Sequence, residues 1–314
     1  MNFDVFTISA LVDEFMDTLV GGRIQDAIDV DTMGLGLEIY ANHQRQYLYM
    51  SADSDNPRVH VVDDKLRRGL PKPTQLGLLF RSYVENGIVT HISQPEWERI
   101  MYIDVEGEKG DVTIIIEPMA RRANVLLVKD GIILDCMKRV GPEDNRYRLS
   151  LPNHEYVAPP PITNQMNPHE VTADDIYNML ERVEKKTAQT RRVLTGQILG
   201  MSPLIASEIV FRATGDTNAK VRDADADALY DAFRAVFEPL LKREWQTGIG
   251  QQDGVVSAFS PYAMESLDWQ PTETMSEAIT SFYGSIAGPD AYNEATKPVQ
   301  EEIEEAKIKL SSKL

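Results

Sequence analysis

The stretch DVTIIIEPMARRANVLLVKDGIILDC, residues 111–136, decides the fold class of this chain. Its short apolar runs are rich in valine and isoleucine and are separated by polar connections, a pattern typical of buried strands. Within it, Asp130-Gly131 is a tight-turn signal of the kind that joins neighbouring antiparallel strands. The stretch therefore predicts successive hairpins, and a mostly antiparallel sheet rather than β-α-β units.

The same kind of pattern continues toward the amino terminus. Leu35, Leu37 and Ile39 lie at every second position, which predicts a strand with one apolar face. Helices are predicted where apolar residues recur at helical spacing, at residues 8–19 and 75–85. Further strands are predicted at residues 45–52, 57–62, 87–92 and 99–107. The order helix, sheet, helix, sheet defines an α+β domain with a β-rich core.

A proline-rich connector separates this region from the next one. The prolines between Pro152 and Pro168 make a stiff segment and mark a domain boundary. Beyond it Thr172 can cap a helix that begins at Ala173, and helical patterns continue to about residue 244. A strand and a helix are predicted at residues 254–261 and 275–283, and the last residues resemble the first turns of a coiled coil. The predicted domains are 1–160, 170–290 and the coiled-coil start 291–314.

The chain is strongly acidic, and the acid is unevenly distributed. The net charge of −17 divides into −7 for residues 1–150, zero for 151–222 and −10 for 223–314. An acidic chain disfavours broad contact with nucleic acid, because phosphates attract lysine and arginine. Five basic doublets occur in the first two regions, and each could form part of a local RNA-binding patch or an ordinary solvated surface: Arg67-Arg68, Arg121-Arg122, Lys138-Arg139, Lys185-Lys186 and Arg191-Arg192.

Residue patterns for catalysis or metal binding are hard to find. The five histidines have no metal-ligand spacing, and the sequence has no nucleophile elbow, Walker loop or dinucleotide-binding glycine motif. Cys136, the single cysteine, lies in an apolar run and is interpreted as a buried structural residue. We therefore expect a protein that is not an enzyme and needs no metal or cofactor. No apolar stretch is long enough for a membrane span, and the start lacks the basic residues of a signal peptide, so we expect a cytoplasmic protein.

The most specific local motif is LGMSPLIASEI, residues 199–209. It resembles a helix-hairpin-helix, in which Gly200 permits a tight turn, Met201 anchors that turn and Ser202 can cap the second helix. The free N–H groups and the positive dipole end of a helix start can bind a phosphate without charged side chains. These three residues form a candidate phosphate-binding hairpin, and the alternative is a plain turn in a small helical bundle.

Several segments, taken in order, resemble the NFACT family. FDVFT at residues 3–7 and GGRI at residues 21–24 are similar to the family's opening. QP at residues 94–95 with ERI at 98–100 is similar to its central strand motif, and EPMARRANV at 117–125 resembles its arginine-asparagine segment. The proline-rich exit, the hairpin motif and the segments FSPY and MSEA continue in the family's order. The resemblance covers nearly the whole chain.

This resemblance implies an architecture, a set of partners and a site. The NFACT-N domain is similar to the N-terminal domain of formamidopyrimidine-DNA glycosylases, and a helix-hairpin-helix domain and a coiled coil follow it. The family binds tRNA and large ribosomal subunits blocked by peptidyl-tRNA, and supports rescue of the stalled ribosome with template-free C-terminal tailing. The implied tRNA-binding residues are Asp4, Glu98, Arg99, Arg121 and Arg122, with glutamate at 98 where the family has aspartate.

Other interpretations of these residues and of the whole chain stay open. Asp4 could simply cap the first helix, and Glu98-Arg99 could form a cross-strand salt bridge. The older family name, fibronectin-binding protein A, suggests a surface adhesin, against which the lack of an export signal argues. A DNA glycosylase or lyase is a third possibility, but the chain begins with Met1-Asn2 where those enzymes carry proline and glutamate.

Overall fold

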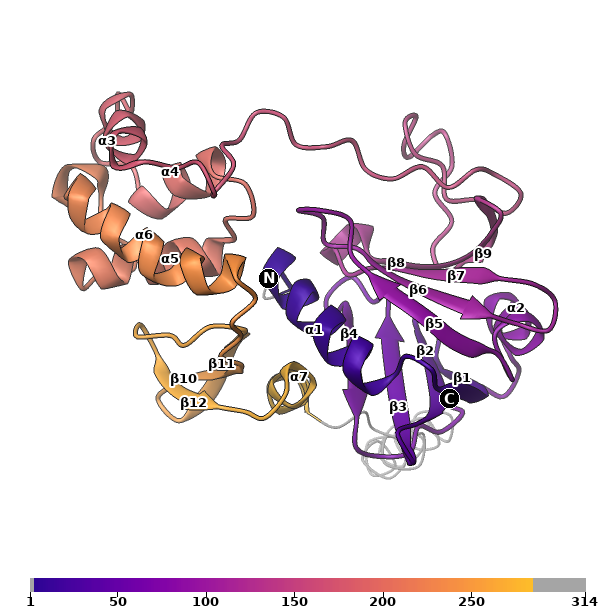
Figure 1. The fold of residues 1–314 in the computed structure, drawn as a ribbon. Coiled ribbons are helices and arrows are strands. Elements are labelled where there is room, and N and C mark those ends of the chain that lie inside the picture. The colour runs from indigo at the N-terminus through magenta and orange to yellow at the C-terminus, as the bar shows by residue number, and fades with distance from the viewer. Residues whose placement is uncertain (1–2, 285–314) are drawn as a thin grey trace, which may run out of the picture.

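The computed structural model describes residues 3–284, which form two lobes joined by an extended connector (Figure 1). The first lobe is built from a large antiparallel sheet and two helices. Its helices are α1 (Val5–Thr18) and α2 (Gln75–Tyr83), with a short 3-10 turn, η1 (Ala120–Arg122). Its strands are β1 (Arg23–Asp31), β2 (Gly34–Ala41), β3 (Gln44–Ser51), β4 (Arg58–Val62), β5 (Ile88–Ser93), β6 (Met101–Glu106), β7 (Val112–Glu117), β8 (Asn124–Lys129) and β9 (Ile132–Cys136).

The strands form one sheet in the order β4-β3-β2-β1-β5-β6-β7-β8-β9, and every neighbouring pair is antiparallel. The junction between β1 and β5 is short, with Arg23 opposite Ile88. Inward-facing residues from both halves of the sheet share one hydrophobic core, for example Leu37 and Ile114. The sheet therefore bends at this junction and wraps around its own core. The predicted α+β class with an antiparallel sheet is confirmed, and so is the turn at Asp130-Gly131, where both residues have positive φ.

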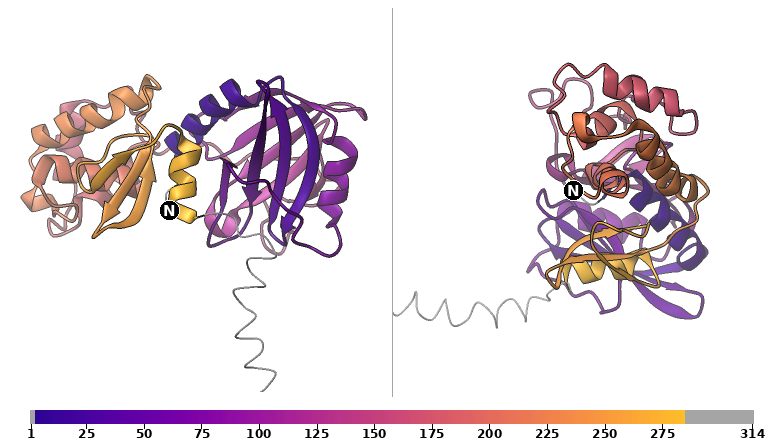
Figure 2. Two further views of the ribbon diagram at one scale, coloured as in Figure 1. Left: turned by 90° about the horizontal axis from the view of Figure 1, so that it is seen from below. Right: turned by 90° about the vertical axis from the view of Figure 1, so that its left-hand side faces the viewer.

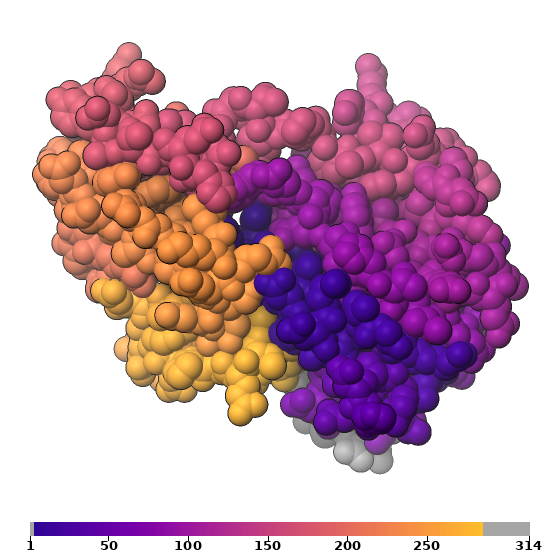
Figure 3. All heavy atoms as spheres, viewed as in Figure 1, coloured from indigo at the N-terminus to yellow at the C-terminus, as the bar shows by residue number. Residues whose placement is uncertain are grey.

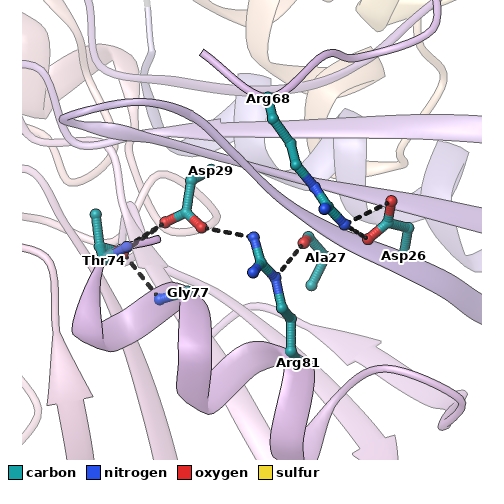
Figure 4. A network of polar contacts seen from close by, with 7 residues as sticks. All are labelled: Asp26, Ala27, Asp29, Arg68, Thr74, Gly77 and Arg81. Atoms are coloured by element: carbon teal, nitrogen blue, oxygen red, sulfur yellow. Dashed lines mark hydrogen bonds and ion pairs between the residues drawn. The ribbon is translucent and has the colours of Figure 1, made fainter. Parts of the chain in front are cut away.

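Strand β1 was not predicted, because its acidic residues interrupt the apolar alternation. The structure explains how one of them, Asp29, is buried (Figure 4). The backbone N–H and hydroxyl of Thr74 donate to Asp29 Oδ1 at 3.1 and 2.6 Å, and the Arg81 guanidinium donates to Oδ2 at 3.1 Å. Gly77 packs so closely that a Cβ there would lie 2.2 Å from the same carboxylate. This network fixes α2 against β1.

The second lobe combines helices with a small sheet. Thr172 caps the first helix in a reciprocal capping box with Asp175, which confirms the predicted start at Ala173. The small sheet has the order β11-β10-β12, and only its strand β11 was predicted. Strands β10 and β12 are short and contain glycine, glutamine or proline, which leaves little strand signal. The elements are α3 (Ala173–Glu181), α4 (Thr190–Gln197), α5 (Pro203–Thr214), η2 (Val221–Asp223), α6 (Ala226–Leu241), β10 (Gly248–Gln252), β11 (Val255–Ser260), β12 (Asp268–Pro271) and α7 (Met275–Tyr283).

Helix α7 lies between the two lobes (Figures 1 and 2). Its buried residues Met275, Ala278 and Ile279 belong to the core of the first lobe, although the predicted domain 170–290 includes them. A second link runs from Arg243, just after α6, to Asp13 in α1, with N–O distances of 2.8 and 2.6 Å. The chain thus returns to its first lobe after building the second. The predicted coiled-coil start at 291–314 lies outside the described residues.

Cys136 is buried, as expected, and burial raises the pKa of its thiol to about 12, so the thiolate is not formed near neutral pH. Between residues 3 and 284, no helix has the length and apolar character that a membrane crossing requires.

Candidate nucleic-acid interface

The start of the chain lies where the lobes meet, and the surface is hollowed there (Figure 3). Asp4 is only 5% exposed. Its Oδ1 accepts a hydrogen bond from the Thr7 N–H at 2.9 Å, so it caps α1, as one of the two sequence interpretations held. Its carboxylate also accepts from the Ser202 hydroxyl, and Arg99 lies within electrostatic reach. Three predicted site residues, distant in sequence, are therefore brought near one another at this junction.

The electrostatics of Asp4 follow from its burial. Burial raises the pKa of the Asp4 carboxyl above its usual value of 3.8, because the charged form loses water. The hydrogen bonds from Thr7 and Ser202 and the charge of Arg99 oppose this shift. The hydroxyl of Tyr262 is a further neighbour, since the Asp4 charge helps to raise its pKa. Tyr262 is buried, and no hydrogen-bond partner for its hydroxyl exists among the described residues.

The α4–α5 turn has the tight geometry that the sequence predicted. Gly200 has φ +74°, Met201 is buried, and Ser202 caps α5 by accepting from the Ile205 N–H at 3.2 Å. Only part of this helix start is available to a phosphate. Pro203 has no N–H, and the first-turn N–H groups of Ile205 and Ala206 are bonded to Ser202, which leaves the amide of Leu204. Phosphate binding at this turn stays a prediction.

The turn packs against the loop that carries Glu98 and Arg99. A Cβ on Gly200 would lie 3.0 Å from the Trp97 ring, and Trp97 makes an edge contact with Phe6 at a centroid distance of 6.1 Å. Trp97 itself has φ +59°, a strained conformation for a bulky residue. The left-handed backbone at Trp97 places its ring between the two lobes, directly before the predicted tRNA-binding pair.

Gln94 fixes this loop to the first helix. Its Nε2 donates to the carbonyl oxygens of Val5 and Glu98 at 2.9 and 2.8 Å, while its Oε1 accepts from the Ser9 hydroxyl at 2.6 Å. A single amide thus holds both ends of the loop to α1. Sequence analysis included Gln94 only as part of a family motif and did not predict this role. A single glutamine in a loop has no spacing pattern from which this role could have been predicted.

Glu98 faces a second cluster, on the outer side of the sheet. Arg148 donates to the buried Glu117 carboxylate at 2.5 Å, and the Tyr156 hydroxyl donates to the same carboxylate at 2.9 Å. Burial raises the pKa of Glu98, and the positive charges of Arg99 and Arg148 oppose that rise. Arg148 and Tyr156 were not predicted as site residues, because their contacts span more than thirty positions of sequence and leave no local pattern.

Arg121 and Arg122 lie in η1, directly after the end of β7. Both are exposed. Met101 pairs with Ile116, so the segment before β6 and the segment after β7 leave the sheet at the same end. The two arginines are therefore presented at the end of the sheet that also carries Glu98 and Arg99. Their arrangement suits phosphate contact, since an exposed guanidinium can bind a phosphate in a bidentate manner.

The junction also contains a pocket of about 280 Å³, whose lining includes Phe6, Gln94, Trp97, His169 and Trp245. Aromatic rings share this lining with aliphatic, polar and charged side chains, among them Leu240, Glu96 and Arg243. Among residues 3–284, no three or more histidine, cysteine or acidic side chains are arranged to hold a metal ion. The site as a whole is suited to binding through charge and stacking.

Solved structures share this two-lobed fold. The N-terminal part of the fibronectin/fibrinogen-binding protein from Streptococcus suis is 24% identical, with a TM-score of 0.69 over 90% of this chain and 98% of that chain. The fibrinogen-binding protein from Staphylococcus aureus is 22% identical, with a TM-score of 0.72 over 91% and 100% of the two chains. The N-terminal domain of fibronectin-binding protein PavA from Streptococcus pneumoniae is 25% identical, with a TM-score of 0.58. The chain therefore shares the fold of these solved bacterial structures.

The family follows from the sequence comparison. The chain belongs to the NFACT family, because the family model described as NFACT N-terminal and middle domains matches residues 4–314. The Rqc2 homolog RqcH of Streptococcus pneumoniae is 27% identical over 322 aligned residues, which cover 99% of this chain and 53% of that protein. RqcH of Bacillus subtilis is 30% identical over 220 residues, covering 68% of this chain and 38% of that protein. The chain spans about half the length of the curated relatives it matches, or less.

Proposed function

We propose that this protein is a ribosome quality-control factor that binds the large ribosomal subunit and tRNA. It acts as a binding protein rather than an enzyme, and the ribosome supplies the chemistry of C-terminal tailing during rescue of a stalled ribosome. One observation carries the proposal: at the junction of the lobes Asp4 is bonded to Ser202 and lies within electrostatic reach of Arg99, and the three residues come from separate segments. The names of its relatives, Rqc2 homologs, support the same assignment.

The residues at the junction have distinct roles in this proposal. Arg99 is half-buried and contacts the RNA, either at a phosphate or by stacking its guanidinium plane on a base. Glu98 accepts hydrogen bonds from the exocyclic amines of a base when it is ionised. Asp4 is buried, so it positions the site by holding α1 and the hairpin turn together. Arg121 and Arg122 add phosphate contacts at the same end of the sheet.

The acidity of the chain limits where RNA can bind. A net charge of −17 repels phosphates over most of the surface. Binding therefore depends on a small basic region, and its affinity falls only gradually with salt, because few phosphate contacts carry it. This arrangement favours a specific partner over nucleic acid in general, which fits a factor that selects blocked ribosomal subunits.

Co-sedimentation with ribosomal subunits tests this function. The 314-residue chain is mixed with purified large subunits, either empty or carrying peptidyl-tRNA, and pelleted through sucrose. We expect the protein in the pellet with subunits that carry peptidyl-tRNA, and less of it with Arg99→Ala. Equal recovery with and without subunits would contradict the proposal.

A second candidate function is supported by the names of the structural relatives. Three of them are described as fibronectin- or fibrinogen-binding proteins. Such a role requires the protein at the cell surface, whereas the first proposal places it with ribosomes. Surface labelling of intact cells and binding to immobilised fibronectin distinguish the two: strong labelling together with saturable fibronectin binding would favour the adhesin.

A further inference from the structure

Residues 140–157 form an anchored segment on the outer face of the large sheet. A bridge between Val140 and Ser150 closes the first part of this segment, and Arg148 fixes the segment near its middle. The Arg148 guanidinium bonds to Glu117 at the end of β7, its Nε donates to the Val157 carbonyl oxygen at 2.5 Å, and it lies 5.6 Å from the centre of the Tyr156 ring. A guanidinium that is partly buried, ion-paired and packed on an aromatic ring holds its segment firmly.

Tyr147 is the residue that this anchored segment presents to solvent. Its side chain is 62% exposed, although its neighbour Arg148 is largely covered. The turn is held by the Asn145 carboxamide oxygen, which accepts from the N–H groups of Tyr147 and Arg148 at 2.9 and 3.1 Å. A single exposed aromatic residue is common on proteins and needs no explanation by itself. The charged residues near Tyr147 in sequence distinguish it from other exposed aromatic residues.

Exposed arginines lie close in sequence to each member of the Glu117–Arg148 pair. Arg146 precedes Tyr147, and Arg121 and Arg122 follow shortly after Glu117 in η1. Within the described part of the chain, no ion pair is found for these three arginines, whereas Arg148 is paired. On a protein with a net charge of −17, three exposed arginines without an ion pair, linked to one exposed tyrosine through the Glu117–Arg148 pair, form a local surface suited to a polyanion, although Glu143 and Asp144 are also exposed in this segment.

This surface is continuous with the candidate tRNA-binding pair. Glu98 is within electrostatic reach of both Arg148 and Glu117, as the effects on its pKa indicate. Tyr102, in β6, makes an edge contact with Tyr156 at 6.3 Å and links the two regions. The Glu117–Arg148 pair thus lies between the region of Glu98 and Arg99 and the segment that carries Tyr147.

We propose that Tyr147 is a stacking platform for an unpaired base of bound RNA, with Arg121, Arg122 and Arg146 contacting the flanking phosphates. The inference rests on the proposed RNA-binding function and extends its site across the outer face of the sheet. Aromatic side chains stack on unpaired bases of any sequence, and neighbouring arginines follow the backbone. A base within a duplex is already stacked, so Tyr147 selects single-stranded RNA or the loop of a folded RNA.

The test measures binding of a labelled, unstructured single-stranded RNA and of the same RNA annealed to its complement, by fluorescence anisotropy. The proteins are the 314-residue chain and its variants Tyr147→Ala, Tyr147→Trp and Tyr177→Ala. Tyr177 is the matched control, because it is 57% exposed on α3 of the other lobe. We expect Tyr147→Ala to weaken single-strand binding by about five- to a hundredfold, Tyr147→Trp to retain it and Tyr177→Ala to leave it unchanged.

Two results would overturn the inference. Single-strand affinity of Tyr147→Ala equal to that of the wild type would remove the platform, and so would an equal loss in Tyr147→Trp, which keeps an aromatic face. Arg99→Ala in the same titration separates this inference from the function on which it rests. If affinity depends on Arg99 but not on Tyr147, only the platform is wrong. If the wild type binds neither RNA, the platform is also wrong, and co-sedimentation with large subunits decides the proposed function.

Discussion

Asp4 joins the two lobes through its buried carboxylate. It caps α1, accepts from the Ser202 hydroxyl that caps α5, and has Arg99 and Tyr262 as charged and polar neighbours. Burying an ionised carboxylate costs free energy, and the hydrogen bonds from Thr7 and Ser202 offset part of that cost. The resemblance to the family implied that Asp4 binds tRNA. In the structure its contacts are with other residues of the protein.

We predict that Asp4→Ala lowers the unfolding free energy by about 0.5–2 kcal/mol, while Asp4→Asn loses little, because asparagine is an equally good cap. The raised pKa of Asp4 adds a pH dependence. Above that pKa the folded state carries the cost of a buried charge, and this cost disappears as the pH falls toward the usual value of 3.8.

Urea unfolding at several pH values checks this prediction. Wild type should gain stability relative to Asp4→Asn as the pH is lowered through the raised pKa. A wild type that instead loses stability relative to Asp4→Asn over this range would mean that the folded protein stabilises the Asp4 charge.

Tyr262 gives a second prediction at the same scale. The Tyr262 hydroxyl is buried without a hydrogen-bond partner among the described residues. Tyr262→Phe should therefore leave the unfolding free energy unchanged or raise that free energy by up to about 1 kcal/mol. Tyr156→Phe is the matched control, because its hydroxyl donates to the Glu117 carboxylate and its loss should cost about 1–3 kcal/mol. If Tyr262→Phe destabilises as much as Tyr156→Phe, the Tyr262 hydroxyl has an acceptor in solution, and Asp4 and Glu208 are the candidates whose charges act on it.

The α4–α5 turn shows how one element connects the lobes. Gly200 and Gly215 have nearly the same backbone conformation, with φ +74° and +77°. A Cβ on Gly200 would press on the Trp97 ring, whereas a Cβ on Gly215 would meet no atom within 4 Å. The two glycines therefore separate the cost of the backbone conformation from the cost of displacing Trp97.

We predict that Gly215→Ala costs about 1–2 kcal/mol of stability, from the left-handed conformation alone. Gly200→Ala should cost more, because a side chain must also move in a packed interface. Chemical denaturation of both variants measures the difference, and Trp97 fluorescence, in a background where Trp245 and Trp269 are phenylalanine, reports whether that ring moves. Equal losses in the two variants, with unchanged emission, would show that the turn does not bear on Trp97.

The elements differ in how well their sequences predict them. Long periodic segments such as α1 and the hairpin of β8 and β9 were predicted, because a single face is buried and local turn chemistry agrees with it. Strand β1 was not, since Asp29 is buried only through donors on α2, more than forty positions away. The site divides in the same way. Family motifs identified Asp4 and Arg99, but Gln94, Arg148 and Tyr262 act through contacts that no local pattern records.

At the scale of the whole molecule, the chain crosses between its lobes more than once. It leaves the first lobe through the connector, builds the helical lobe, and returns with α7 into the first core (Figure 1). The Arg243–Asp13 pair and the Trp245 N–H, which also donates to Asp13 at 2.7 Å, link the lobes beside α1. The arrangement of the two lobes, and with it the geometry of the junction, depends on these links.

A double-mutant cycle of Asp13→Ala and Arg243→Ala should give a coupling energy of at most about 1 kcal/mol, because both side chains are substantially exposed. Since salt screens exposed pairs, the coupling should shrink as ionic strength rises. Urea unfolding of the four proteins at low and high salt provides the values. A coupling energy that is large and independent of salt would show that the pair is more buried in solution than in this structure.

Binding of tRNA to the wild type, to Arg99→Ala and to Arg234→Ala is the measurement that tests the central claim most directly. Arg234 is an exposed arginine on α6, paired with Glu238 on the same helix, and it serves as the charge-matched control. We expect Arg99→Ala to weaken tRNA binding about tenfold or more in a filter assay, with Arg234→Ala close to wild type. Equal affinities for all three proteins, or equal losses in both variants, would contradict an RNA-binding site at the junction of the lobes.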